Sequence, residues 1–117
     1  MSFEHDIATV EAWLKAGLPA DYGRFLQSHE ESVVGEQVLL YGLSSLVERN
    51  ETYETLRYCP GYLAIGDDRG GRAVIIPLAG PLRDVYLVGH GYMDTRGFRL
   101  LPLPFAEWLD NGCPAPE

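Results

Sequence analysis

Three short apolar segments in the second half of the chain lie so close together that they can pair in only one way. The segments are Tyr62–Ile65, Ala73–Leu78 and Val85–Val88, and the connections between them contain "GDDRGG" and "AGPLRD". Two parallel strands need a crossover of about a dozen residues or more, whereas antiparallel strands can be joined by a tight turn. The sequence therefore predicts three antiparallel strands that follow one another as a meander.

Two segments near the N-terminus have the spacing of amphipathic helices. Residues 6–16 repeat apolar side chains at helical intervals, and Gly17 follows as the expected stop. Those side chains are Ile7, Val10, Trp13 and Leu14. In the second segment Pro19 suits the first helical turn, and we expect this helix to end near Ser28.

A strand and two further helices complete the expected elements. Val38–Tyr41 is an apolar run between glycines, which favours a strand. Ser45 begins a capping-box spacing, with a glutamate three residues on, and predicts the start of a third helix. The segment "PLPFAEWLDNG" predicts a last helix that stops at Gly112. This order predicts an α+β fold in a single domain over residues 1–117, with helices gathered on one face of an antiparallel sheet.

The net charge of the chain favours some classes of binding partner and excludes others. Its 117 residues include 17 acids and nine bases, a formal net charge of −8, and residues 1–60 alone carry ten acids and four bases. Nucleic acids and anionic membrane surfaces are bound through Lys and Arg, so we expect neither as a partner. An acidic domain suits a basic protein partner, although solubility alone also explains the acidity.

The expected compartment is the cytoplasm. No apolar run approaches the ~20 residues of a membrane span, and the first residues, "MSFEHDIATVEAW", carry acids where a signal peptide carries bases. Cys59 and Cys113 lie far apart in the sequence without a CxxC motif or metal-ligand spacing, so we expect two free thiols rather than a disulfide.

Side chains that can bind a metal or act in catalysis are few. Asp67, Asp68, His90 and Asp94 would converge if the turn and the later loop shared one end of the sheet. The segment "DDRGG" lacks the alternating carboxylates of a calcium loop, and Arg69 would oppose a cation, so we expect no metal and no cofactor. No nucleophile elbow accompanies His90. We expect no enzyme, and the alternative is catalysis by His90 and Asp94.

The segment "GDDRGG" can be a loop that binds a partner or only a turn that reverses the chain. Its glycines suit a tight hairpin, because glycine tolerates positive φ. Its two aspartates have no packing role in this interpretation, so we expect them to be exposed and available to a partner. Tyrosine suits interfaces as well as sheet faces. The predicted partner-binding residues are Glu30, Glu31, Glu36, Tyr41, Asp67, Asp68, Tyr92 and Asp94.

Five segments, in this order, resemble the SUKH superfamily, whose type members are the Smi/Knr domains. They are "LPADYGRFL", "LLYGL", "PGYLAIGDDRGGRAVIIPL", "VYLVGHG" and "FAEWL", and they extend from Leu18 to Leu109. The resemblance implies an α+β fold with helices around a curved sheet and no catalytic activity. The family's glycine-acid-glycine turn falls on Gly66, Asp67, Asp68, Gly70 and Gly71.

The same resemblance implies a function. Bacterial members are typically immunity proteins, each of which binds and blocks the toxin made by its own cell. Many of those toxins are nucleases with basic grooves, and carboxylates of an immunity protein can occupy a groove built for phosphates. Eukaryotic relatives suggest the alternative, a housekeeping interaction or scaffold domain without a toxin partner.

Overall fold

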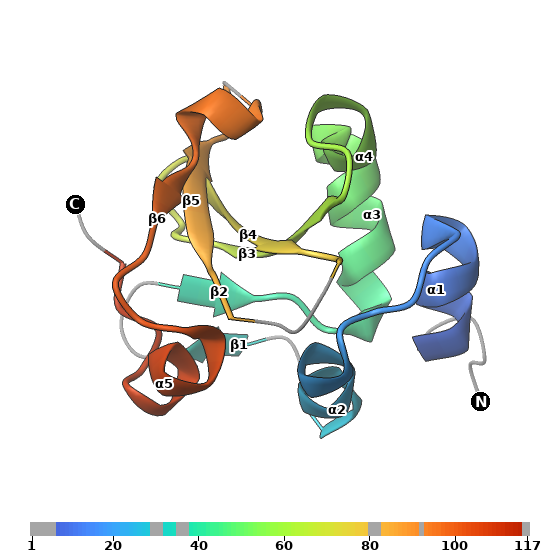
Figure 1. Ribbon diagram of the computed structural model, residues 1–117, viewed down its shortest axis with the longest axis horizontal. Helices are drawn as coiled ribbons and strands as arrows, with labels where there is room; N and C mark the ends of the chain where they lie inside the picture. Colours follow the sequence, from blue (N-terminus) through green and yellow to red (C-terminus); the bar gives the residue numbers. More distant parts are fainter. Residues whose placement is uncertain (1–6, 29–31, 35–37, 80–82, 92, 116–117) are drawn as a thin grey trace.

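A computed structural model describes residues 7–28, 32–34, 38–79, 83–91 and 93–115 of the chain. Within these residues six strands form one antiparallel sheet, and their order in the sheet is their order in the sequence (Figure 1). The strands are β1 (Ser32–Val34), β2 (Val38–Leu40), β3 (Tyr62–Asp67), β4 (Arg72–Pro77), β5 (Tyr86–Gly89) and β6 (Arg99–Leu100). The helices are α1 (Ile7–Leu14), α2 (Ala20–Ser28), α3 (Leu43–Tyr53), α4 (Thr55–Tyr58) and α5 (Phe105–Asp110), with a 3-10 turn, η1 (Thr95–Gly97). The predicted α+β class and the meander of β3, β4 and β5 are confirmed.

Side chains alternate along the central strands between two buried clusters. In β4, for example, Val74 and Ile76 belong to the main core, whereas Ala73 and Ile75 belong to a smaller cluster on the other face. Because both faces are covered, these strands appear in the sequence as continuous apolar runs rather than as an apolar–polar alternation.

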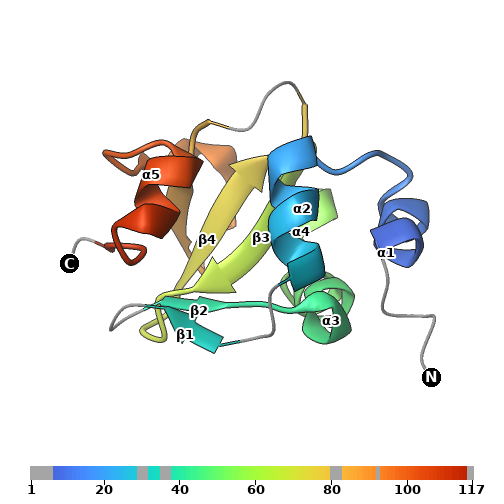
Figure 2. The ribbon, with the colours of Figure 1, turned by 90° about the horizontal axis from the view of Figure 1, so that it is seen from below.

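The main core lies under α1, α2, α3 and α5, each of which contributes buried side chains to it. Figure 2 shows α2 in front of β3 and α5 to the left of β4, and both helices contribute buried side chains to the main core. Tyr22 of α2 meets Phe105 of α5 edge to face, with ring centroids 6.1 Å apart. Trp108 has no exposed surface, and its indole N–H donates to the Pro114 carbonyl at 3.0 Å. The predicted last helix therefore docks on the core.

The smaller cluster covers the opposite face with short side chains and a rim of aromatic rings. Cys59 and Ala64 are among its buried members. The rings of Tyr62 and Phe98 pack edge to face with centroids 4.9 Å apart. Tyr53, near the end of α3, packs against both clusters, and Figure 1 shows α3 and α4 beside the sheet. The helices therefore share the main core, as the predicted arrangement on one face requires, and only the end of α3 also reaches the smaller cluster among the described residues.

Several element ends differ from the sequence prediction for local reasons. Helix α1 ends at Leu14, and Lys15 rather than Gly17 takes the left-handed conformation that stops it, with φ of 58°. Helix α3 begins at Leu43 after Gly42, so Ser45 lies in its first turn and caps nothing. Cys59 and Cys113 are free thiols, as predicted, and both are buried. No helix in the described part of the chain is long and apolar enough to cross a membrane.

Candidate functional site

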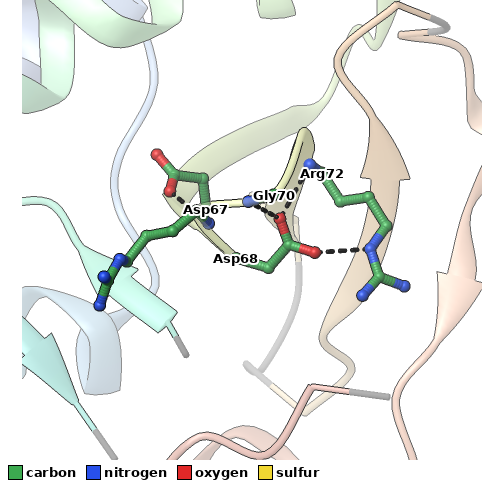
Figure 3. Close-up of polar contacts among 5 residues, drawn as sticks. Asp67, Asp68, Gly70 and Arg72 are labelled. Atoms are coloured by element: carbon green, nitrogen blue, oxygen red, sulfur yellow. Dashed lines mark hydrogen bonds and ion pairs between the residues drawn. The ribbon is translucent and has the colours of Figure 1, made fainter. Parts of the chain in front are cut away.

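The turn between β3 and β4 is held together by the carboxylate of Asp68. Its Oδ1 accepts hydrogen bonds from the backbone N–H groups of Gly70 and Arg72, at 2.8 and 3.0 Å (Figure 3). Its Oδ2 accepts from Nε of Arg72 at 2.6 Å, and only 7% of the Asp68 side chain is exposed. Burial alone would raise the pKa of Asp68, but the donors of Arg72 and Gly70 favour the carboxylate and lower the pKa below its usual value.

Asp67 is the last residue of β3, and its carboxylate joins a buried polar network. Oδ1 accepts from the backbone N–H of Arg69 at 2.9 Å, and Oδ2 accepts from the Tyr41 hydroxyl at 2.7 Å. The Tyr41 hydroxyl also lies 2.9 Å from that of Tyr53. Burial, with these bonds to Tyr53 and Asp67, raises the pKa of Tyr41, so the phenol keeps its proton.

The expectation that both aspartates are exposed is therefore wrong. Asp67 is 9% exposed, because β3 extends two residues beyond the predicted end and pairs there with β2. Asp68 turns back onto the backbone of the hairpin. Tyr41, another predicted contact residue, has no exposed surface. A contribution of these three residues to partner binding stays a prediction, and the structure gives each of them a role inside the fold.

The glycines of "GDDRGG" are required for different reasons. Gly71 has φ of 102°, as a hairpin glycine should. Gly66 lies inside β3, where a Cβ atom would come 2.3 Å from the Leu39 carbonyl oxygen, so close approach of β2 requires it. The second left-handed residue of the turn is Arg69, with φ of 61°, rather than Gly70.

A cavity of about 450 Å³ opens between the α3–α4 corner and the loop that follows β5. The corner contributes Tyr53, Glu54 and Tyr58 to its lining, and the loop contributes His90, Met93 and Asp94. The rings of Tyr53 and His90 stack with their centroids 4.5 Å apart. Tyr58 is 47% exposed, which is unusual for so large a side chain in this fold. The cavity thus combines aromatic walls with two carboxylates.

The loop that lines this cavity is anchored to the β3–β4 turn. The backbone N–H of His90 donates to the Gly71 carbonyl at 2.8 Å, so the two loops share one end of the sheet. Asp94 accepts from the backbone N–H and from Nε and Nη2 of Arg96, at 2.8, 3.1 and 3.0 Å. The Arg96 side chain lowers the pKa of Asp94, and 34% of the Asp94 side chain is exposed.

Asn50 is a structural residue that the sequence gives no signal for. It lies 1% exposed within α3, and its side chain donates to the Ala64 carbonyl at 2.9 Å and accepts from the Ala64 N–H at 2.8 Å. Strand β2 pairs with Gly66 and Asp67 of β3. At Ala64, beyond the end of that pairing, the side chain of Asn50 bonds the backbone of β3 instead. This contact fixes α3, which supplies Tyr53 to the cavity.

The remaining predicted contact residues are distributed as follows. Glu30, Glu31, Glu36 and Tyr92 lie outside the described residues. The structure brings Tyr41 and Asp67 together and places Asp94 at the cavity. Among the residues that the structure describes, no three His, Cys, Asp or Glu side chains are grouped closely enough to hold a metal ion.

Comparison with known proteins identifies the family of the chain. Residues 4–111, nearly the whole length, match the family model described as SMI1 / KNR4 family (SUKH-1). No curated protein matches the chain. The ordered segments that resembled the SUKH superfamily lie within the matched range. The chain therefore belongs to the SMI1/KNR4 (SUKH-1) family.

Proposed function

We propose that this chain is a cytoplasmic immunity protein that binds a cognate bacterial toxin and neutralises it by direct contact, without catalysis. Membership of the SMI1/KNR4 family carries the proposal, because the bacterial branch that the sequence resembles consists typically of immunity proteins. The protein's own role is then recognition, and the chemistry that matters is the complementarity of its surface to the toxin.

The distribution of charge supports a basic partner. The chain carries a formal net charge of −8. Glu48 and Glu51 are exposed on α3 and line a hollow beside α1, and Glu54, the exposed residue that follows α3, lines the cavity together with Asp94. Carboxylates presented on a rigid helix can face a nuclease groove that is lined with Lys and Arg. We place the toxin contact on this side of the molecule.

Co-expression with the toxin candidate encoded beside the chain's own gene tests this proposal. We expect the chain to restore growth and to co-elute with the toxin. A variant with Glu48→Gln and Glu54→Gln should restore growth less well than a matched variant with Glu107→Gln and Asp110→Asn, which also loses two charges. Toxicity that persists would contradict the proposal, and a gene without a toxin neighbour would instead favour the housekeeping interaction domain.

Salt dependence of the association rate should report the same charge complementarity. The screening length falls from ~10 Å at 0.1 M salt to ~3 Å at 1 M. We therefore expect k_on for the toxin to fall as salt rises, while dissociation, which depends on buried apolar contacts, changes less. Stopped-flow mixing at several salt concentrations measures both rates, and a salt-independent k_on would rule out electrostatic steering.

A further inference from the structure

We propose that the cavity between the α3–α4 corner and the loop after β5 receives the guanidinium group of an arginine side chain from the protein partner. The inference rests on the proposed function in that the partner is a basic protein. It adds the site and the side chain that the site recognises.

The lining of the cavity carries aromatic rings on which a planar cation can stack. Tyr53 lines the cavity from the α3–α4 corner and His90 lines it from the loop, with their rings stacked on each other, and Tyr58 exposes nearly half of its surface. Guanidinium groups stack on aromatic faces, which an ammonium group does less well. The cavity also contains Met93, and aromatic residues and methionine are the types enriched at the centres of protein interfaces.

The polar groups of the lining carry the complementary charge. Glu54 and Asp94 line the cavity, and no Lys or Arg stands among the described residues that line it. A carboxylate has about four acceptor positions and can accept two parallel N–H bonds from one guanidinium. The two carboxylates approach from different elements, so an arginine between them would connect the α3–α4 corner to the loop.

The chain's own arginines already show this chemistry at the edge of the site. Arg57 lies 3.2 Å from Glu54 and 5.3 Å above the Tyr58 ring. Arg96 forms an ion pair with Asp94 at 3.0 Å. The side chains of Arg57 and Arg96 are 72% and 80% exposed, and exposed pairs of this kind are weak. An incoming arginine can therefore replace Arg57 on surfaces that are already suited to a guanidinium.

Tyr53 is supported from inside the fold. The Tyr53 hydroxyl lies 2.9 Å from that of Tyr41, which donates to Asp67. The buried network fixes the hydroxyl end of Tyr53, while its ring faces His90. The site is consequently preformed, which lowers the entropic cost of binding a flexible side chain.

A titration of the isotope-labelled full chain with N-acetyl-arginine amide, followed by amide chemical shifts, tests the site without any toxin. We expect the shifts to concentrate on residues 52–58 and on residues 90, 91, 93 and 94. N-acetyl-citrulline amide, which has the same shape without the charge, should bind about three- to fivefold more weakly or not at all. Shifts scattered over the acidic surface, or equal binding of the two probes, would overturn the proposal.

Three variants sharpen the test. Asp94→Asn should weaken binding of the arginine probe, and Glu107→Gln, which removes an exposed acid on α5, should leave it unchanged. Arg57→Gln should strengthen binding, because it removes the competing guanidinium. Weaker or unchanged binding by Arg57→Gln would contradict the competition that the structure predicts.

The growth assay separates failure of this site from failure of the toxin assignment. If the probe binds at the cavity and no toxin is neutralised, the arginine site stands and the immunity function falls. If the chain neutralises a toxin while Tyr58→Ala and Asp94→Asn protect fully and the probe does not bind, the function stands and the arginine site falls.

Discussion

The β3–β4 turn and the loop after β5 have similar sequences and different roles. Both combine aspartate with glycine, as "GDDRGG" and "GHGYMD", and the bond from His90 to Gly71 joins them at one end of the sheet. In the turn, the Asp68 side chain is 7% exposed and is held largely by backbone donors. In the loop, the Asp94 side chain is 34% exposed, and two of its three bonds come from the guanidinium of an exposed arginine.

The comparison shows what makes a carboxylate structural. Backbone N–H groups cannot leave Asp68 unless the hairpin opens, so its charge is part of the fold. The guanidinium of Arg96 can leave Asp94 without disturbing a strand, so that charge stays available to another molecule. Four experiments test the structural roles of these residues, from the largest expected effect to the smallest.

Trp108→Ala sets the scale, because Trp108 belongs to neither loop. Removing this fully buried ring should lower the free energy of unfolding by about 3–5 kcal/mol. Leu100→Ala, which truncates a side chain that is 58% exposed, should change it by less than about 0.5 kcal/mol. Urea unfolding measures both, and equal losses would mean that α5 does not dock on the core.

Asn50→Ala removes the support that α3 gives to the cavity. The Ala64 N–H and carbonyl would be left buried without partners, so we expect a loss of about 2–4 kcal/mol. Asn111→Ala is the matched control, because Asn111 also donates to a helix carbonyl, that of Glu107, but at an exposed site. A loss no larger than that of the control would show that the Asn50 bridge does not stabilise the fold.

Acid should remove the contribution of the turn selectively. The pKa of Asp68 is lowered in the folded protein, so its carboxylate stabilises the fold above its usual pKa of about 3.9 and loses this effect as pH falls through the lower folded value. The difference in unfolding free energy between the wild type and Asp68→Asn should therefore shrink below about pH 4. A difference that stays constant between neutral pH and pH 2 would contradict a structural role for the charge.

The elements that depend on residues close together in the sequence could be predicted from it. The meander follows from the length of its connections, and the last helix from the spacing of Phe105 and Trp108. Strands β1 and β6 were missed because three and two residues are too short to show a period. The burial of Asp67 depends on pairing with Leu39, far away in the sequence, so no local pattern contains it.

The candidate site was harder to predict than the fold for the same reason. Asp94 and His90 were visible as polar residues after a strand, and they do line a cavity. Its other side is lined by Tyr53 and Tyr58, which come from α3 and α4, and Asn50 bonds α3 to β3. Side chains that are distant in the sequence and meet only in the folded protein produce no regular spacing from which their contact could be predicted.

The unfolding of Asp68→Asn and Asp94→Asn in urea, measured side by side at neutral pH, tests the distinction between the two loops most directly. Both variants remove one charge and keep a side chain of the same shape. Asp68→Asn weakens bonds from two backbone N–H groups and from Arg72, so we expect a loss of about 1–2 kcal/mol. Asp94→Asn should unfold at the same urea concentration as the wild type, within the error of the measurement. Equal losses, or a larger loss for Asp94→Asn, would contradict the account.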